Sequence, residues 1–393
     1  MAGGPGGVSR RTVIRGVGGA AFVGASLAAL KLPFFSVAGA QQDPATCFAQ
    51  DVSATDKKLV ISNWPDYIDP IHKSGSTVSV FEQQTGISVS YTDDVNDNAE
   101  FYAKVKNQLA SCQSIKRDMI VMTDWMAARM IGLGWIQPLN AANLPNFTKN
   151  LIPRLQNKPW DPHQQFHAPW QSGLTGIAYN ADKTKEVKSF TELLTRSDLK
   201  GKVTLLTEMR DTMGFMLRTV GADPEQFTQN QWENAVNSLH GFVSDGNIRS
   251  FNGNDYLTDL ASGNTLACEA WSGDVIIAQQ DNPNLKFVVP EEGMSLWADN
   301  MLIPNLATHQ TNAEKWIDYY YDPMVAAQLV NYNYYICPVE GAQQAMEKVN
   351  PKLVNAPLIF PDEKMLENPW GFMSLNDQQE IEYERDWSDV TSG

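Results

Sequence analysis

Strand-like and helix-like segments alternate between residues 59 and 122, and this order limits the fold more than any other feature of the chain. Short apolar or alternating runs at 59–62, 87–91 and 118–122 predict β-strands. Two helical stretches separate them, one stopped by Gly86 and one covering Ala99–Leu109. The β-α-β-α-β order predicts a parallel sheet with helices packed on it. Ligands of such sheets bind beyond the carboxyl ends of the strands.

A second α/β unit begins near Gly173. Strands are predicted at 174–180, 203–206, 265–270 and 286–290, and a short helix at 255–263. Residues 301–304 are interpreted as a strand that returns to the first unit. About 350 residues after the leader are too many for one core, so we expect two lobes. Crossing strands between them predict a hinged cleft that can close on a ligand.

Tryptophan lies within three residues of aspartate repeatedly along the chain, and four of these segments, far apart in the sequence, are candidates for a common site. A tryptophan face attracts a cation, and a carboxylate is its counter-charge. If folding gathers these segments, the product is an anionic, aromatic-walled box suited to an organic polycation. The alternative for any one pair is chance, because tryptophan is usually buried and aspartate favours turns. The four segments are Trp64-Pro65-Asp66-Tyr67, Asp124-Trp125, Trp271-Ser272-Gly273-Asp274 and Trp297-Ala298-Asp299.

Residues 1–40 read as a cleavable twin-arginine export signal. Ser9–Ile14 contain the arginine pair, Val17–Leu30 are apolar and glycine-rich, and Ala38-Gly39-Ala40 precede a cleavage site before Gln41. A membrane anchor is the alternative, but the apolar run is short of the roughly 20 residues that span a bilayer. Cleavage changes the net charge from −15 to about −19. So acidic a protein argues against nucleic acid and anionic lipid as partners.

Four cysteines in an oxidising compartment allow three pairings. We consider Cys47–Cys112, which would tether the new N-terminus, together with Cys268–Cys337; lipidation of Cys47 is left open. No CxxC or HExxH motif occurs and the five histidines are scattered, so neither a metal nor a cofactor is expected.

Over residues 58–390 the chain resembles the spermidine/putrescine-binding proteins of bacterial ABC importers. Asn63–Ile68 are similar to the family's opening Asn-Trp-x-x-Tyr motif, and Phe81–Val89 to its next helix and strand. Asn254–Gln279 and Trp297–Pro304 follow in the family's order. The resemblance implies a type II periplasmic-binding-protein fold, with two lobes of mixed sheet flanked by helices and joined by hinge strands. It also implies a binding protein and not an enzyme.

The family's ligand residues can be transferred to this chain position by position. Aromatic walls are implied at Trp64, Tyr67, Trp271 and Trp297, and a late tyrosine at Tyr335. Two acids at Glu208 and Asp211 would hold one end of a polyamine, Asp274 would form an aromatic–acid pair with Trp271, and Asp299 would be the central carboxylate. Trp125 stands where the spermidine-binding members have tyrosine. The predicted ligand set is Trp64, Tyr67, Asp124, Trp125, Glu208, Asp211, Trp271, Asp274, Trp297, Asp299 and Tyr335.

Three positions depart from the family's pattern or complicate it. Asp124 is an extra acid, and Pro369–Phe372 lack the glutamine of the spermidine-binding members. The extra acid, the missing glutamine and the presence of Asp274 together favour a diamine over spermidine. Arg210 lies between the two acids Glu208 and Asp211, and we expect it to point outward or to be structural.

The sequence therefore predicts an exported, monomeric solute-binding protein that captures putrescine or spermidine and delivers it to the membrane permease of an ABC importer. The predicted parts are the signal at 1–40, lobe 1 from 41–172 with 301–340, and lobe 2 from 173–300 with 341–393. One alternative keeps the fold but binds another organic cation or an amino acid; for a carboxylate ligand, Arg210 is the only cleft cation that the sequence suggests. A secreted hydrolase using Glu208 and Asp211 is a further alternative.

Overall fold

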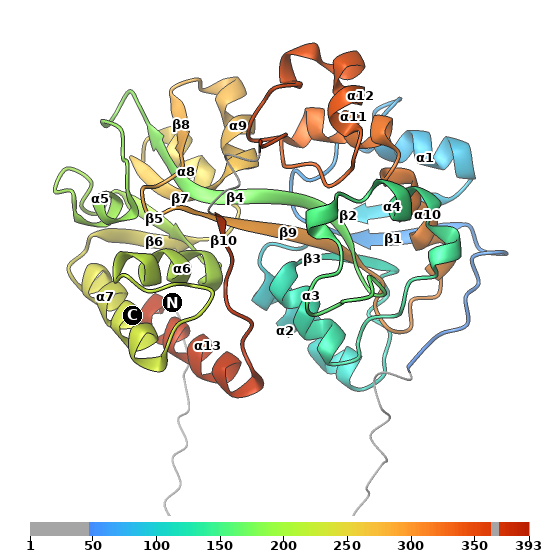
Figure 1. Ribbon diagram of the computed structural model, residues 1–393, viewed down its shortest axis with the longest axis horizontal. Helices are drawn as coiled ribbons and strands as arrows, with labels where there is room; N and C mark the ends of the chain where they lie inside the picture. Colours follow the sequence, from blue (N-terminus) through green and yellow to red (C-terminus); the bar gives the residue numbers. More distant parts are fainter. Residues whose placement is uncertain (1–46, 363–368, 393) are drawn as a thin grey trace, which may run out of the picture. The chain divides into compact units, whose positions relative to one another are not determined.

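The computed structural model describes residues 47–362 and 369–392 (Figure 1). Its strands are β1 Lys58–Ser62, β2 Ser88–Thr92, β3 Met119–Thr123, β4 Ala168–Asn180, β5 Val203–Leu206, β6 Ile248–Asn252, β7 Ala267–Trp271, β8 Leu285–Val288, β9 Met294–Leu302 and β10 Pro369–Trp370. Its α-helices are α1 Thr77–Thr85, α2 Asn98–Ala110, α3 Asp124–Gly132, α4 Pro145–Asn150, α5 Phe190–Thr195, α6 Met209–Thr219, α7 Gln229–Ser244, α8 Tyr256–Ser262, α9 Ser272–Asp281, α10 Gln310–Tyr320, α11 Pro323–Asn333, α12 Ala342–Val349 and α13 Asp377–Thr391.

The predicted β-α-β-α-β unit is confirmed as β1-α1-β2-α2-β3. The strand β1 pairs in parallel with both β2 and β3. Local sequence sets the helix ends: the Ser76 hydroxyl caps α1, and Gly86 ends it in a left-handed conformation at φ 69°. Asp97 caps α2 by accepting from two backbone N–H groups. The loop after β1 and the start of α3 therefore meet at the carboxyl edge of this half-sheet.

Two long strands carry the sheet from one lobe to the other. The sheet order is β2-β1-β3-β9-β4-β7-β5-β6, and β4 and β9 run antiparallel side by side through its middle (Figure 1). Both are longer than predicted: β4 begins at Ala168 and β9 at Met294. Trp297 and Asp299 consequently lie inside β9 and not ahead of it. The crossing strands of the predicted two-lobed fold are thus β4 and β9.

Two large hydrophobic cores are present. One gathers the β1–β3 half with α10, α11 and α12 and continues into α8, β7 and α9, and the other gathers β5, α6, α7 and α13. The helix α12 packs against α11, whereas α13 packs against α7. The lobe bounds given above stay a prediction.

One of the two cysteine pairs considered from the sequence is present and the other is not. Cys47 and Cys112 form a disulfide. Cys268 and Cys337 are free and buried, so that pairing is wrong. The thiol of Cys268 faces the backbone of Ala178 on β4, whereas Cys337 meets the Tyr320 hydroxyl. The two thiols therefore contact different groups. The tertiary fold determines these contacts, and the sequence alone does not reveal them.

The predicted leader at 1–40 lies outside the described residues. Within residues 47–362 and 369–392, no helix is long and apolar enough to cross a membrane. The same part of the chain holds no group of three or more histidine, cysteine or acidic side chains that could bind a metal ion.

Candidate ligand-binding site

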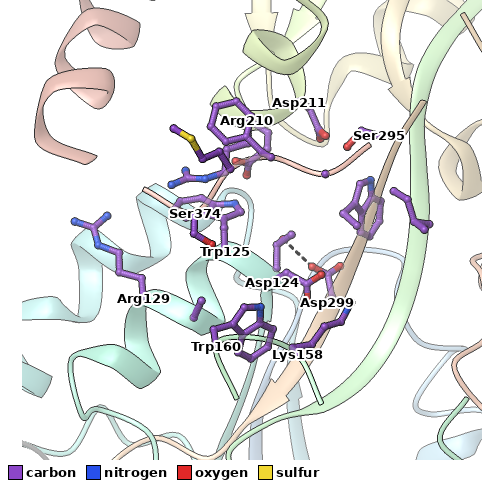
Figure 2. A pocket seen from close by; sticks show the side chains of 18 of the residues that line it. Asp124, Trp125, Arg129, Lys158, Trp160, Arg210, Asp211, Ser295, Asp299 and Ser374 are labelled. Atoms are coloured by element: carbon purple, nitrogen blue, oxygen red, sulfur yellow. Dashed lines mark hydrogen bonds between the residues drawn. The ribbon is translucent and has the colours of Figure 1, made fainter. Parts of the chain in front are cut away.

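A cavity of about 740 Å³ lies beside the carboxyl ends of β1, β3 and β7 and against β9. Its lining comes from both halves of the sheet and includes α3, α6 and α13 (Figure 2). Ten of the eleven predicted ligand residues line it. They are Trp64, Tyr67, Asp124, Trp125, Glu208, Asp211, Trp271, Trp297, Asp299 and Tyr335.

Three tryptophans form a continuous edge-to-face wall. The ring centroids of Trp64 and Trp271 lie 6.4 Å apart, and those of Trp271 and Trp297 also 6.4 Å. Tyr335 continues the wall at 5.7 Å from Trp297, and Tyr67 packs on Tyr335 at 4.9 Å. Such aromatic pairs contribute roughly 0.5–1.5 kcal/mol each beyond burial of their area. The five rings therefore form one continuous aromatic surface along the cavity.

Asp299 is held in the cavity by two side-chain hydrogen bonds. It lies on β9 opposite Thr123 of β3, and this cross-strand pairing brings the Thr123 hydroxyl within 2.7 Å of its carboxylate. The Tyr67 hydroxyl donates to the other carboxylate oxygen, also at 2.7 Å. Burial raises the pKa of Asp299 to about 7, although both hydrogen bonds lower it. The carboxylate is held in place, but its charge is poorly compensated.

Glu208 and Asp211 stand at the start of α6, where the helix N-terminus favours negative charge. The Trp271 indole donates to Asp211 at 3.0 Å, and the Asn98 amide donates to Glu208 at 2.9 Å. Burial raises the pKa of both acids, and that of Glu208 further because Asp97 and Asp211 are near. Asp299, Glu208 and Asp211 are only 3%, 9% and 6% exposed, and none forms an ion pair within the described residues.

Asp274 is the predicted ligand residue that the cavity does not reach. It lies in the first turn of α9, behind Tyr335, whose hydroxyl donates to it at 2.5 Å. The Tyr256 hydroxyl donates from the other side at 3.1 Å. Burial raises the pKa of Asp274 to about 6, against both hydrogen bonds. The position of Asp274 fits a support for Tyr335 better than a direct ligand contact.

The Asp124–Trp125 pair opens α3, and its two side chains have different surroundings. Asp124 lines the cavity and accepts from the Asn300 amide at 2.8 Å. The Trp125 ring is covered by Arg210, whose guanidinium carbon lies 3.4 Å from the ring centroid (Figure 2). Arg210 is only 5% exposed and pairs with Glu380, so the side chain does not point outward and is structural. A protein cation already occupies the face of Trp125.

Several lining residues were not predicted from the sequence. Lys158 and Arg129 add two cations to the cavity, where Arg210 was the only one expected. Lys158 comes from a polar, proline-flanked loop with no pattern that assigns it to a site. Arg129 lies one turn after Trp125 on α3, and that spacing is the only signal that could have found it. The other lining residues not predicted include Thr123, Trp160, Ser295, Trp370, Phe372, Ser374 and Glu380.

Gly173 seats Trp297 against β4. The two residues pair across β4 and β9, and an added Cβ at Gly173 would lie 3.0 Å or less from three atoms of the Trp297 indole. Gly173→Ala is therefore expected to displace Trp297 and to lower the free energy of unfolding by about 1–3 kcal/mol, as overpacking does. Urea unfolding measures the change. Gly241→Ala on α7 is the control, because a Cβ there meets nothing within 4 Å and should be neutral or stabilising. Equal stability changes in the two variants would contradict the seating role.

Matches with known proteins agree with the fold. Residues 114–368 match the family of bacterial extracellular solute-binding proteins. The spermidine/putrescine-binding periplasmic protein of Escherichia coli is 28% identical over 312 residues, 79% of this chain and 85% of that protein. The putrescine-binding periplasmic protein PotF of the same organism is 28% identical over 361 residues, 87% and 93% of the two chains.

Solved structures of solute-binding proteins share this fold. The spermidine/putrescine ABC transporter substrate-binding protein PotD of Streptococcus pneumoniae superposes with a TM-score of 0.69 at 25% identity, over 86% of this chain and 99% of that chain. These matches confirm the type II periplasmic-binding-protein fold, the resemblance seen in the sequence motifs and the expectation of a binding protein instead of an enzyme. The chain belongs to the family of bacterial extracellular solute-binding proteins.

Proposed function

We propose that this protein captures a polyamine, putrescine or spermidine, in the cavity between its lobes and delivers it to an ABC importer. One observation carries the proposal: Asp299, Glu208 and Asp211 are buried carboxylates beside a tryptophan wall, with no ion-pair partner within the described residues. Buried charges without partners are costly. A ligand that brings ammonium groups and methylene chain supplies the missing cations and covers the indole faces.

The proposed binding mode follows the layout of the cavity. One ammonium group lies at Asp299, and the other lies at Glu208 and Asp211 at the start of α6. The methylene chain lies along Trp64, Trp271 and Trp297. Ligand charge relieves the repulsion between the acids, so it favours the state in which both lobes contact it. The Escherichia coli relatives, a spermidine/putrescine-binding and a putrescine-binding periplasmic protein, support this ligand class.

The proposal includes export and a membrane partner. The twin-arginine leader at 1–40 predicts export, and the Escherichia coli relatives are named as periplasmic. The Streptococcus pneumoniae protein is named as an ABC transporter substrate-binding protein, which supports a permease partner. A monomer without nucleic-acid partners remains our expectation. Among polyamines we favour a diamine, because Asp124 adds an acid to the cavity and the segment Pro369–Phe372 offers no glutamine.

Isothermal titration calorimetry on the chain beginning at Gln41 tests the proposal. We expect micromolar or tighter binding of putrescine, and weaker binding of spermidine. N-Acetylputrescine is the matched control ligand: it keeps the carbon chain but replaces one ammonium by a neutral amide, so one end of the cavity keeps its acids unpaired. We expect it to bind at least tenfold more weakly, about 1.4 kcal/mol. Failure of putrescine, cadaverine and spermidine all to bind would reject the proposal.

A ligand with both an ammonium and a carboxylate is the second candidate, favoured by one observation. Lys158 lines the cavity and stands on its wall near Asp299 (Figure 2). A lysine there can receive a carboxylate while Asp211 or Glu208 receives the amine. A thermal-shift screen of diamines, amino acids and quaternary amines separates the two candidates, since only a bound ligand stabilises the folded state. Stabilisation by an ω-amino acid but by no diamine would favour the second candidate.

A further inference from the structure

Four side chains form a cluster at the α13 side of the cavity. Its one carboxylate, that of Glu380, is paired with an arginine. Arg210 donates from Nη2 to Glu380 Oε1 at 2.5 Å, and both side chains are less than a tenth exposed. The guanidinium carbon of Arg210 lies 3.4 Å from the centroid of the Trp125 ring. The second oxygen of Glu380 lies 3.7 Å from Arg129 Nη1. We call Trp125, Arg129, Arg210 and Glu380 the α13 cluster.

The α13 cluster joins the two halves of the sheet. Trp125 and Arg129 lie on α3, directly after β3, whereas Arg210 lies on α6, directly after β5. Glu380 lies on α13, which is fixed to α7 of the second half. In that contact Tyr383 stacks on Trp232 at 4.0 Å, and the Trp232 indole donates to Asp386 at 3.0 Å. Every contact between α3 and the α6–α13 side of this cluster therefore bridges the lobes.

The chemistry of the α13 cluster does not suit an ammonium ligand. Its two arginines repel a cation, and the carboxylate of Glu380 already has two cationic neighbours. The Trp125 face that could stack on a ligand is covered by Arg210. A buried charge-assisted hydrogen bond and a desolvated cation–π contact are strong interactions, and both form without any ligand.

We propose that the α13 cluster is a latch that stabilises the closed arrangement of the lobes, with Arg210 and Glu380 acting as positioning residues. A protein that closes on its ligand releases it only after opening. Interactions made only in the closed state lower the fraction of open protein, so they slow ligand release. Most changes in affinity among variants of one site arise in the dissociation rate. The latch therefore sets how long a ligand stays, and the acids and tryptophans set which ligand enters.

Glu380→Gln tests the latch without a ligand. Dyes on Lys106 of α2 and Asn237 of α7, both exposed and on different halves, report the lobe separation by energy transfer. We expect a longer mean dye distance in ligand-free Glu380→Gln than in wild type. Asp389→Asn is the matched control, since it removes one exposed carboxylate from the same helix and should leave the distance unchanged. An unchanged distance in Glu380→Gln would overturn the latch.

Ligand kinetics give a second readout, which rests on the proposed function. For putrescine we expect dissociation at least about tenfold faster in Glu380→Gln, with association within twofold of wild type. Because Glu380→Gln can unfold the protein by removing the nearest counter-charge of buried Arg210, Arg129→Gln serves as a milder variant. Its side chain is 27% exposed, and we expect smaller changes in the same direction. Unchanged dissociation in both variants overturns the latch. If wild type binds no polyamine, the proposed function fails and the dye distance alone decides on the latch.

Discussion

Asp299→Asn is expected to weaken putrescine binding by at least tenfold, about 1.4 kcal/mol, while stabilising the ligand-free protein at pH 8. The substitution keeps the shape of the side chain and its place between Tyr67 and Thr123, but removes the charge. An ammonium at this point then meets a neutral amide, and the charge-assisted part of the contact is lost. Calorimetry at pH 8 measures the loss. Unchanged affinity would remove Asp299 from the site.

The gain in stability follows from the raised pKa of Asp299. Burial raises this pKa from 3.8 to about 7 in the folded protein. Between these two values the folded state binds more protons than the unfolded state, so the free energy of unfolding falls as pH rises through this window. Above pH 7 the full cost of ionising buried Asp299 is subtracted from the free energy of unfolding. The size of the pKa shift sets an upper bound of about 4 kcal/mol on this cost. Asparagine does not ionise, so the Asp299→Asn protein does not carry this cost.

Urea unfolding of the ligand-free protein at pH 5 and pH 8 checks this expectation. Asp299→Asn should be more stable than wild type at pH 8, and its advantage should shrink towards pH 5, where wild-type Asp299 is protonated. Asp389→Asn is the control, because it also removes one carboxylate but from an exposed position on α13 that does not line the cavity. An equal advantage of Asp299→Asn at both pH values would show that the raised pKa is not the cause.

The sequence predicted the elements that local patterns encode. Alternating strand and helix periods indicated the β1–β3 unit, and Trp64 and Tyr67 were expected just past a strand end because β1 stops at Ser62. The interior of β9 was missed, since Met294–Asn300 mixes polar and aromatic residues with no clear period. Its pattern is set by pairing with β3 on one side and β4 on the other, and such pairing is not visible in a single segment.

Long-range contacts account for what the sequence did not predict at the site. Asp274 stands three residues after Trp271, yet the first turn of α9 carries it behind Tyr335, which is 61 residues away in sequence. The partner of Arg210 is Glu380, 170 residues further on. Neither partner can be chosen without the fold, because several acids and tyrosines are available for each. Residue types thus indicated the chemistry of the site, and tertiary packing assigned each residue its role.

Polyamine affinity is expected to fall about a hundredfold between pH 7 and pH 5. In the ligand-free protein the pKa of Asp299 is about 7, and those of Glu208 and Asp211 are also raised by burial. A bound ammonium favours the ionised carboxylate and lowers its pKa, so binding releases a proton wherever the free acid is protonated. One released proton makes the association constant tenfold smaller for each pH unit below the pKa of the free acid. Affinity should therefore rise with pH and level off above about pH 7.

Calorimetry from pH 5 to pH 8, in two buffers with different ionisation heats, measures both the affinity and the number of protons released. The ligand itself does not cause the change, because alkyl ammonium groups such as that of lysine titrate near pH 10. In Asp299→Asn the number of protons released on ligand binding should fall by about one. Any dependence of affinity on pH that remains belongs to Glu208 and Asp211, which share the far end of the cavity. Affinity that stays flat or falls as pH rises would mean that these carboxylates are already ionised before the ligand arrives. The burial of unpaired acids would then not be what drives cation capture.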